Sequence, residues 1–124
     1  MELRLDLTDT RPLNPIWTFG GNTCHAPLLL REDLGRHLAM AASTLGFRYV
    51  RCHGLLSDNM GVVVGKRRYD FSKIDAAIEA LLARGLKPFM ELSCMPRAMA
   101  RQGKFICHYR FYSSPPRHWQ DWYH

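Results

Sequence analysis

Hydrophobic residues recur along the 124-residue chain with two different periods. Over residues 31–45 and again over residues 72–85, apolar side chains return every three or four positions, which is the period of a helix with one buried face. Glu32 and Asp33 lie in the first turn of the earlier segment, where the helix dipole favours acids, and Gly46 follows its last turn. The sequence therefore predicts an amphipathic helix over residues 31–45.

The second helical segment carries signals at both ends. Ser72 and Asp75 have the spacing of a capping box, in which two side chains satisfy free backbone N–H groups at a helix N-terminus. Arg84 and Gly85 stand where helices favour a cation and then a glycine. The apolar stripe between them comprises Ile74, Ala77, Ile78, Leu81 and Leu82. We expect a second amphipathic helix here.

Shorter segments have the composition of strands. Residues 47–54 and 86–93 are rich in β-forming side chains, and residues 16–19 read as a short strand that ends in a flexible turn at residues 20–22. Residues 2–8 alternate strictly between polar and apolar, which predicts a half-buried strand. Its apolar face comprises Leu3, Leu5 and Leu7.

From residue 16 the predicted order is strand, helix, strand, helix, strand, and a last helix is expected after Pro115 and Pro116. Such alternation is typical of an α/β fold with a parallel sheet. A complete (β/α)₈ barrel needs about 250 residues. The chain is therefore long enough for about the first three βα units of such a barrel.

Candidate chemistry collects at the end of the predicted strand 47–54. Arg51 and His53 are two residues apart and so share one face of that strand. The carboxyl ends of parallel strands are where α/β proteins bind ligands. Glu91, on the next strand, is either a lone inward general acid or the partner of Arg51 in a salt bridge. We favour the salt bridge because it pairs two otherwise unmatched charges.

Composition places the chain among globular proteins, with 47% hydrophobic and 23% charged residues. The N-terminus has neither the basic region nor the apolar stretch of a signal peptide, and the apolar runs are too short to cross a membrane. We expect a cytoplasmic protein without a membrane partner.

Four cysteines could form disulfides in three ways, but their wide spacing favours reduced thiols. Three of them precede a histidine, which raises the alternative of a zinc site. Adjacent residues on a strand point to opposite faces, however, and no Cys-x-x-Cys or His-x-x-x-His spacing occurs. We expect neither a metal nor a cofactor. The cysteines are Cys24, Cys52, Cys94 and Cys107.

The formal charge of +6 and the pI near 9.5 raise the alternative of a polyanion partner. The longest basic run is Lys66-Arg67-Arg68, which a solvated loop explains equally well. Aromatic and basic residues also interleave over residues 104–112 and 119–123, as in proteins that bind single-stranded nucleic acid. The same rings suit a sugar site. No recognised nucleic-acid-binding fold is present, so no nucleic-acid partner is expected.

Three segments together resemble the N-terminal part of the catalytic domain of glycoside hydrolase family 39, the family of β-xylosidases and α-L-iduronidases. They are residues 47–61 with Arg51-x-His53-Gly54, residues 69–75 with Tyr-Asp-Phe-x-Lys-Ile-Asp, and residues 85–96 with Lys-Pro-Phe-x-Glu-Leu. The combination is far more specific than any one motif. The resemblance runs from about Trp17 to Trp122.

The resemblance implies a (β/α)₈ barrel and retaining hydrolysis of a glycoside or oligosaccharide by two glutamates about 5 Å apart. The family's acid/base lies in an Asn-Glu-Pro tripeptide, which is absent from these 124 residues. We therefore expect no catalytic residue in this chain, and a β-xylosidase-like hydrolase that is inactive alone. The alternative is a non-catalytic module that binds carbohydrate or nucleic acid.

The family likeness also assigns site residues and domains. It implies that His53 and His25 contact the sugar, with Arg51 and Glu91 supporting the site; the alternative for each histidine is a satisfied core residue. Residues 1–15 would belong to an accessory β-region and residues 16–124 to a barrel cut short. Because three strands leave two open edges, we expect the chain alone to be aggregated, oligomeric or molten.

Overall fold

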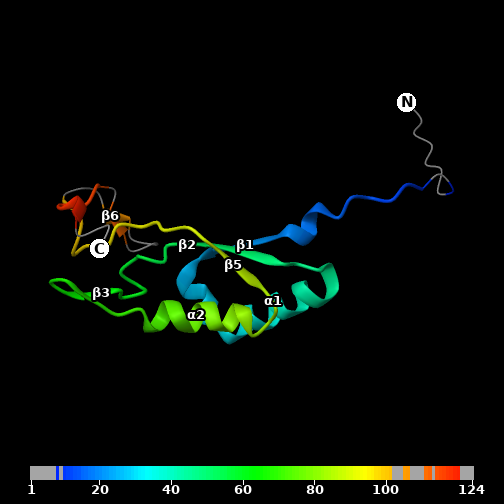
Figure 1. Cartoon of the computed structure of the whole chain (residues 1–124), viewed down its shortest axis with the longest axis horizontal. Helices are drawn as coiled ribbons and strands as arrows, with labels where there is room; N and C mark the ends of the chain where they lie inside the picture. Colours follow the sequence, from blue (N-terminus) through cyan, green and yellow to red (C-terminus); the bar gives the residue numbers. More distant parts are fainter. Residues whose placement is uncertain (1–7, 9, 102–104, 107–110, 113, 121–124) are drawn as a thin grey trace, which may run out of the picture.

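The computed structural model describes residue 8 and residues 10–101, 105–106, 111–112 and 114–120. The main sheet has three strands, and Figure 1 shows both helices beneath it. In chain order the elements are η1 (Ile16–Phe19), β1 (Gly20–His25), η2 (Ala26–Leu30), α1 (Glu32–Leu45), β2 (Tyr49–His53), β3 (Val63–Gly65), β4 (Arg68–Tyr69), α2 (Ser72–Leu82), β5 (Lys87–Met90), β6 (Phe105–Ile106) and β7 (Phe111–Tyr112).

The main sheet is parallel and has the strand order β1-β2-β5. Tyr49 of β2 lies opposite Gly20 of β1 and Lys87 of β5, which fixes the register of all three strands. Two βα connections place α1 and α2 on the same face, so the opposite face is left open (Figure 1). The predicted α/β fold with a parallel sheet is thus confirmed for the part of the chain that the structure describes.

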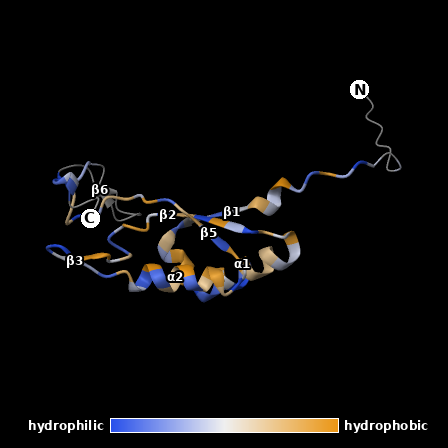
Figure 2. Ribbon diagram, in the orientation of Figure 1, coloured by the Kyte–Doolittle hydropathy of each residue, from blue (hydrophilic) through white to orange (hydrophobic). Residues whose placement is uncertain are grey.

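The core lies between this sheet and the two helices. Val50 and Cys52 of β2 are buried against apolar residues that include Leu38 of α1 and Leu81 of α2. Figure 2 shows the hydrophobic colour concentrated where the helices face the sheet. The helical period found in the sequence therefore marks the buried side of each helix, except at Leu82, which is 54% exposed in the last turn of α2.

Both predicted helices form, although the cap of α2 differs from the prediction. Gly46 ends α1 in the left-handed conformation, and its N–H donates to the Ala42 carbonyl at 3.1 Å. At α2 the Ser72 side chain makes no cap. Instead the Asp70 carboxylate accepts the Ser72 N–H at 2.9 Å, and this hydrogen bond lowers the pKa of Asp70. The predicted Ser72–Asp75 capping box is wrong because Ser72 is the first residue of the helix, so the helix begins one residue earlier than that box requires.

The first strand of the sheet is also displaced from its prediction. Residues 16–19 form a 3₁₀-helix, and the glycines predicted to be a turn belong to β1 itself. A Cβ on Gly20 would lie 1.8 Å from the Tyr49 carbonyl oxygen, and one on Gly21 would lie 2.8 Å from the Phe47 ring. These glycines therefore allow a close approach of β1 to its neighbours rather than a turn.

Two hairpins were absent from the sequence prediction. Strands β3 and β4 pair antiparallel, and Lys66 and Arg67 form the turn between them; β6 and β7 pair in the same way. Trp119 and Gln120 are helical, as expected after Pro116. The strand predicted over residues 2–8 lies almost entirely outside the described residues. Within the described part, no helix is both long enough and apolar enough to span a membrane.

Candidate functional site

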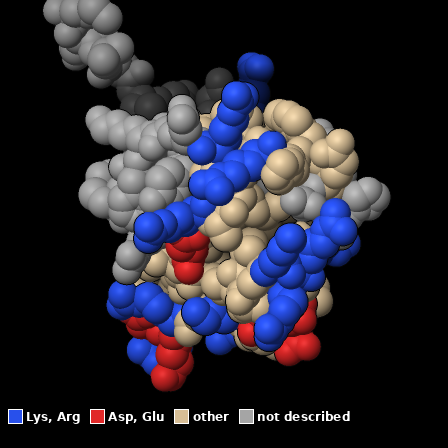
Figure 3. Space-filling view, turned by 90° about the vertical axis from the view of Figure 1, so that its left-hand side faces the viewer, with Lys and Arg blue, Asp and Glu red and all other residues tan. Residues whose placement is uncertain are grey.

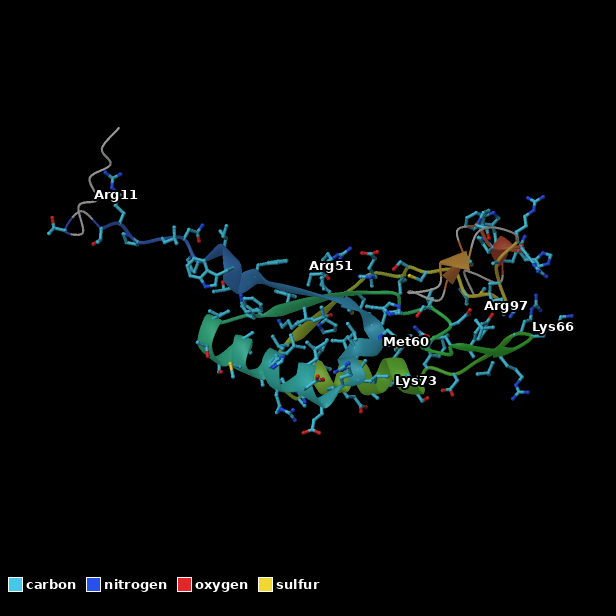
Figure 4. All side chains as sticks on the ribbon, turned by 180° about the vertical axis from the view of Figure 1, so that it is seen from behind. Arg11, Arg51, Met60, Lys66, Lys73 and Arg97 are labelled. Carbon is cyan, nitrogen blue, oxygen red and sulfur yellow. The ribbon has the colours of Figure 1, made fainter. Side chains whose placement is uncertain are left out.

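The side chains of β2 alternate between the two faces of the sheet. Val50 and Cys52 point to the helices and are buried, whereas Tyr49, Arg51 and His53 are only partly buried. In Figure 4 Arg51 rises from the face that carries no helix. The prediction that Arg51 and His53 share one face is confirmed, and that face is the open one.

Arg51 connects all three strand positions across this face. Its guanidinium forms an ion pair with Glu91, which follows β5, and its Nη1 donates to the Asn22 side-chain oxygen of β1 at 3.3 Å. The ion pair expected from the sequence is therefore present. The Arg51 and Glu91 side chains are 43% and 40% exposed, so solvent screens their attraction and the contribution of the pair to stability is modest. Asn22 was missed because it was assigned to a turn.

The two histidines predicted to be in the site lie next to each other. His25 ends β1, His53 ends β2, and the two residues are partners in the strand register. Their ring centroids are 6.0 Å apart at an angle of 40°. His25 is 8% exposed, whereas His53 is partly open. The structure thus places two imidazoles, one buried and one accessible, at the carboxyl ends of adjacent parallel strands.

Gly54 is packed tightly behind the buried imidazole. A Cβ at this position would lie 2.4 Å from His25 Cδ2, and the backbone φ of +76° is in the left-handed region. The Gly54 N–H also donates to Ser93 Oγ at 3.0 Å, which ties the end of β2 to the segment after β5. Gly54 and Ser93 were missed as site residues. The only sequence signal was the glycine directly after His53.

A small cavity lies on the same face, at the other end of the strands. It has a volume of about 250 Å³, and its lining includes Phe19, Tyr49, Arg51 and Phe89. Phe19 and Tyr49 stack with ring centroids 5.0 Å apart. The open face therefore combines aromatic rings at the start of the strands with charged and imidazole side chains toward their ends.

The cysteines near the site are not suited to nucleophilic chemistry. Cys52 and Cys94 are free thiols, and burial raises the pKa of each. A raised pKa keeps a thiol protonated at neutral pH, and the thiol is a much weaker nucleophile than the thiolate. Among the described residues, no group of three or more His, Cys, Asp and Glu side chains is arranged to hold a metal ion.

A parallel sheet whose functional side chains gather at its carboxyl end is typical of α/β enzymes. The sequence matches the family described as glycosyl hydrolases family 39 over residues 2–124, and the chain belongs to that family. This confirms the resemblance that the Arg51-x-His53-Gly54 motif and its neighbours indicated.

Known relatives include two curated β-xylosidases. The chain is 40% identical over 114 residues to the enzyme of Caldicellulosiruptor saccharolyticus, covering 89% of this chain and 23% of that protein. It is 32% identical over 113 residues to the enzyme of Geobacillus stearothermophilus, covering 86% and 22%. The chain thus spans less than a quarter of the length of these relatives.

Solved structures give the same relationship. A monomeric β-xylosidase from Caulobacter crescentus superposes with a TM-score of 0.74 at 36% identity, over 86% of this chain and 22% of that one. The family 39 enzyme from Xanthomonas axonopodis superposes with a TM-score of 0.72 at 33% identity, over 90% and 23%. The fold seen here is therefore a segment of the fold of these glycosidases.

Proposed function

We propose that residues 16–124 supply about the first three βα units of a (β/α)₈ barrel in a retaining, β-xylosidase-like glycoside hydrolase. The observation that carries this proposal is the pairing of His25 and His53 at the carboxyl ends of adjacent parallel strands in a family 39 chain. Active sites of such barrels lie at that end. Residues 1–15 would belong to an accessory β-region of the same enzyme.

Each site residue has a defined part in this proposal. His53 and His25 would hydrogen-bond hydroxyls of the non-reducing sugar, because a neutral imidazole offers one donor and one acceptor. The Arg51–Glu91 ion pair would lie beneath that sugar and support the site, and the hydrogen bond to Asn22 would keep the guanidinium in position. The substrate would be a xylose-containing glycoside or oligosaccharide, and these side chains would bind and orient it.

We expect the 124-residue polypeptide alone to show no turnover of an aryl β-xyloside. Retaining hydrolysis needs an acid/base and a nucleophile, and no Asn-Glu-Pro tripeptide occurs in this sequence to provide the first. Release of the aryl group by purified protein measures this directly. Turnover that persists through purification and is lost in Glu91→Gln would contradict the prediction and make Glu91 a catalytic acid.

The sugar-binding role of His53 can be tested in a hybrid enzyme. In this hybrid, the chain replaces the matching segment of the Caldicellulosiruptor β-xylosidase, to which it is 40% identical. We expect His53→Ala to lower kcat/KM for the β-xyloside on the order of 100-fold, because an unmade hydrogen bond to a substrate hydroxyl costs about 2–3 kcal/mol.

The matched control is His37→Ala, which removes an exposed imidazole from α1 on the far side of the sheet. This variant should retain the kcat/KM of the parent hybrid. Equal kcat/KM values for His53→Ala and His37→Ala would refute the proposed contact with the sugar.

A further inference from the structure

A larger cavity lies beyond the carboxyl ends of the strands, between two segments distant in sequence. One wall is the β3–β4 hairpin and the other is formed by residues 98, 99, 117, 118 and 120. In Figure 1 both segments lie at the end of the molecule toward which β1, β2 and β5 run. The volume of about 830 Å³ is within the range of small-molecule sites, roughly 300–1,000 Å³. We call it the hairpin cavity.

Basic side chains line the hairpin cavity on both walls. Lys66 and Arg67 come from the turn of the hairpin, whereas Arg117 comes from the opposite wall, next to His118. Among the ten described residues that line it, none is an aspartate or a glutamate. Figure 3 views the molecule from this end and shows Lys and Arg side chains crowded over the face.

Two of the basic side chains at the cavity have no acidic partner among the described residues. Neither the Lys66 ammonium nor the Arg117 guanidinium pairs with a described carboxylate. Arg117 Nε donates to the Ala100 carbonyl at 2.7 Å, which anchors the guanidinium at the cavity wall. A solvated loop explains Lys66 and Arg67 alone, but it does not explain why a second segment brings Arg117 to the same cavity. Lys66 and Arg117 are both exposed, so solvent screens their repulsion, and an anion between them would be attracted by both.

The backbone of the hairpin turn supports a role for its side chains. Arg67 has a φ of 53°, a left-handed conformation that glycine adopts without cost and that disfavours other residues by roughly 1–2 kcal/mol. Strained backbone of this kind is often found at ligand sites. Arginine at this position makes the folded chain less stable than glycine would, but it places a guanidinium at the cavity.

The uncharged part of the lining suits a sugar ring. Tyr69 and Met99 contribute an aromatic face and a thioether, and Val63 adds an aliphatic side chain. Aromatic faces pack against apolar C–H surfaces, while an arginine fork binds the two oxygens of a carboxylate. The cavity therefore combines a surface for a pyranose with donors for a negative charge.

We propose that the hairpin cavity binds an acidic sugar, a uronic-acid residue of the saccharide whose xylose end occupies the His25–His53 site. This inference rests on the proposed function and extends it from neutral xylosides to saccharides that carry a carboxylate. Lys66 and Arg117 bind the carboxylate, and Tyr69 contacts the ring. A site of this size holds one or two sugar units, which favours a saccharide over a long polyanion.

The test uses two ligands that differ only at one carbon, methyl β-D-glucuronide and methyl β-D-glucoside. Their binding to the 124-residue chain is measured by saturation-transfer NMR, which observes the ligand and tolerates protein oligomers. We expect the glucuronide to bind at least tenfold more tightly than the glucoside. The double variant Lys66→Gln/Arg117→Gln should remove this preference. The control Arg36→Gln/Arg48→Gln, with the same loss of charge at exposed positions of α1 and before β2, should keep it.

Several results would overturn the proposal. The first is equal affinity for both sugars, and the second is an equal loss of affinity in the control variant. The third is displacement of the glucuronide by equimolar inorganic phosphate. The fourth is displacement of the glucuronide by a lower concentration of oligouridylate, which would indicate a nucleic-acid surface. The hybrid enzyme provides the same binding measurement in a second folded context. It also separates the two proposals, because Lys66→Gln/Arg117→Gln should remove the preference for the glucuronide, whereas His53→Ala should lower turnover of a neutral xyloside.

Discussion

Gly54→Ala in the hybrid enzyme should lower the free energy of unfolding by about 2–5 kcal/mol and impair turnover. Two costs add: a left-handed φ of +76° disfavours alanine by roughly 1–2 kcal/mol, and overpacking costs about 1–3 kcal/mol. The new methyl group would lie 2.4 Å from His25 Cδ2 and 2.7 Å from Nε2, so the imidazole would have to move. Chemical denaturation and kcat/KM for a β-xyloside measure the two effects.

Gly85→Ala is the matched control because alanine at position 85 has the same left-handed backbone strain but makes no contact like that between position 54 and His25. Gly85 has a φ of +72°, and a Cβ there would meet no atom within 4 Å. We expect it to cost only about 1–2 kcal/mol and to leave turnover intact. The double variant Gly54→Ala/His25→Ala should regain part of the lost stability. Equal costs for Gly54→Ala and Gly85→Ala would show that the contact with His25 is not limiting.

The 124-residue chain alone should self-associate through the open face of its sheet. Phe19 and Phe89 are 58% and 51% exposed there, and β5 is an edge strand among the described residues. Exposed apolar rings next to an unpaired strand edge favour association. Because full burial of one phenylalanine contributes about 1.5–3 kcal/mol, Phe19→Lys/Phe89→Lys should raise the dissociation constant on the order of 100-fold. Sedimentation velocity over a concentration series measures it.

The control adds the same two lysines to the helices. Met40 of α1 and Leu82 of α2 are 64% and 54% exposed and lie on the opposite layer. Met40→Lys/Leu82→Lys should leave the association unchanged. A parent chain that sediments as a monomer at every concentration and melts cooperatively would contradict the expectation and show that three strands and two helices suffice for an independent fold.

The acidic-sugar proposal depends on the long connections after β2 and β5. Neither the β3–β4 hairpin nor the described residues 98–101 and 114–120 belong to the main sheet, yet the hairpin and residues 98, 99, 117, 118 and 120 line the hairpin cavity. Loops at this end of parallel strands vary without disturbing the strands themselves, so they are suited to set substrate preference. The His25–His53 pair would then bind the sugar whose glycosidic bond is cleaved. The hairpin cavity would determine which other sugar of the saccharide is preferred.

The sequence by itself determined the elements whose signals are local. The period of apolar residues determined both helices and their buried faces, and alternation along β2 placed Arg51 and His53 on one face. The alternation of side chains along strands also sufficed to suggest the Arg51–Glu91 ion pair. Both residues were predicted on the same face of neighbouring parallel strands, where their side chains can meet. Combined motifs were specific enough to indicate the family.

The tertiary structure decided what depends on another segment. Gly20 and Gly21 looked like a turn, and only the carbonyl of Tyr49 and the ring of Phe47 show why a strand needs glycine there. Asn22 became a partner of Arg51 only once β1 was placed. The hairpin cavity joins residues about 30 to 50 positions apart in the sequence. Periodicity reports which face of an element is buried, but contacts between segments depend on how those elements pack in space, and no local pattern encodes them.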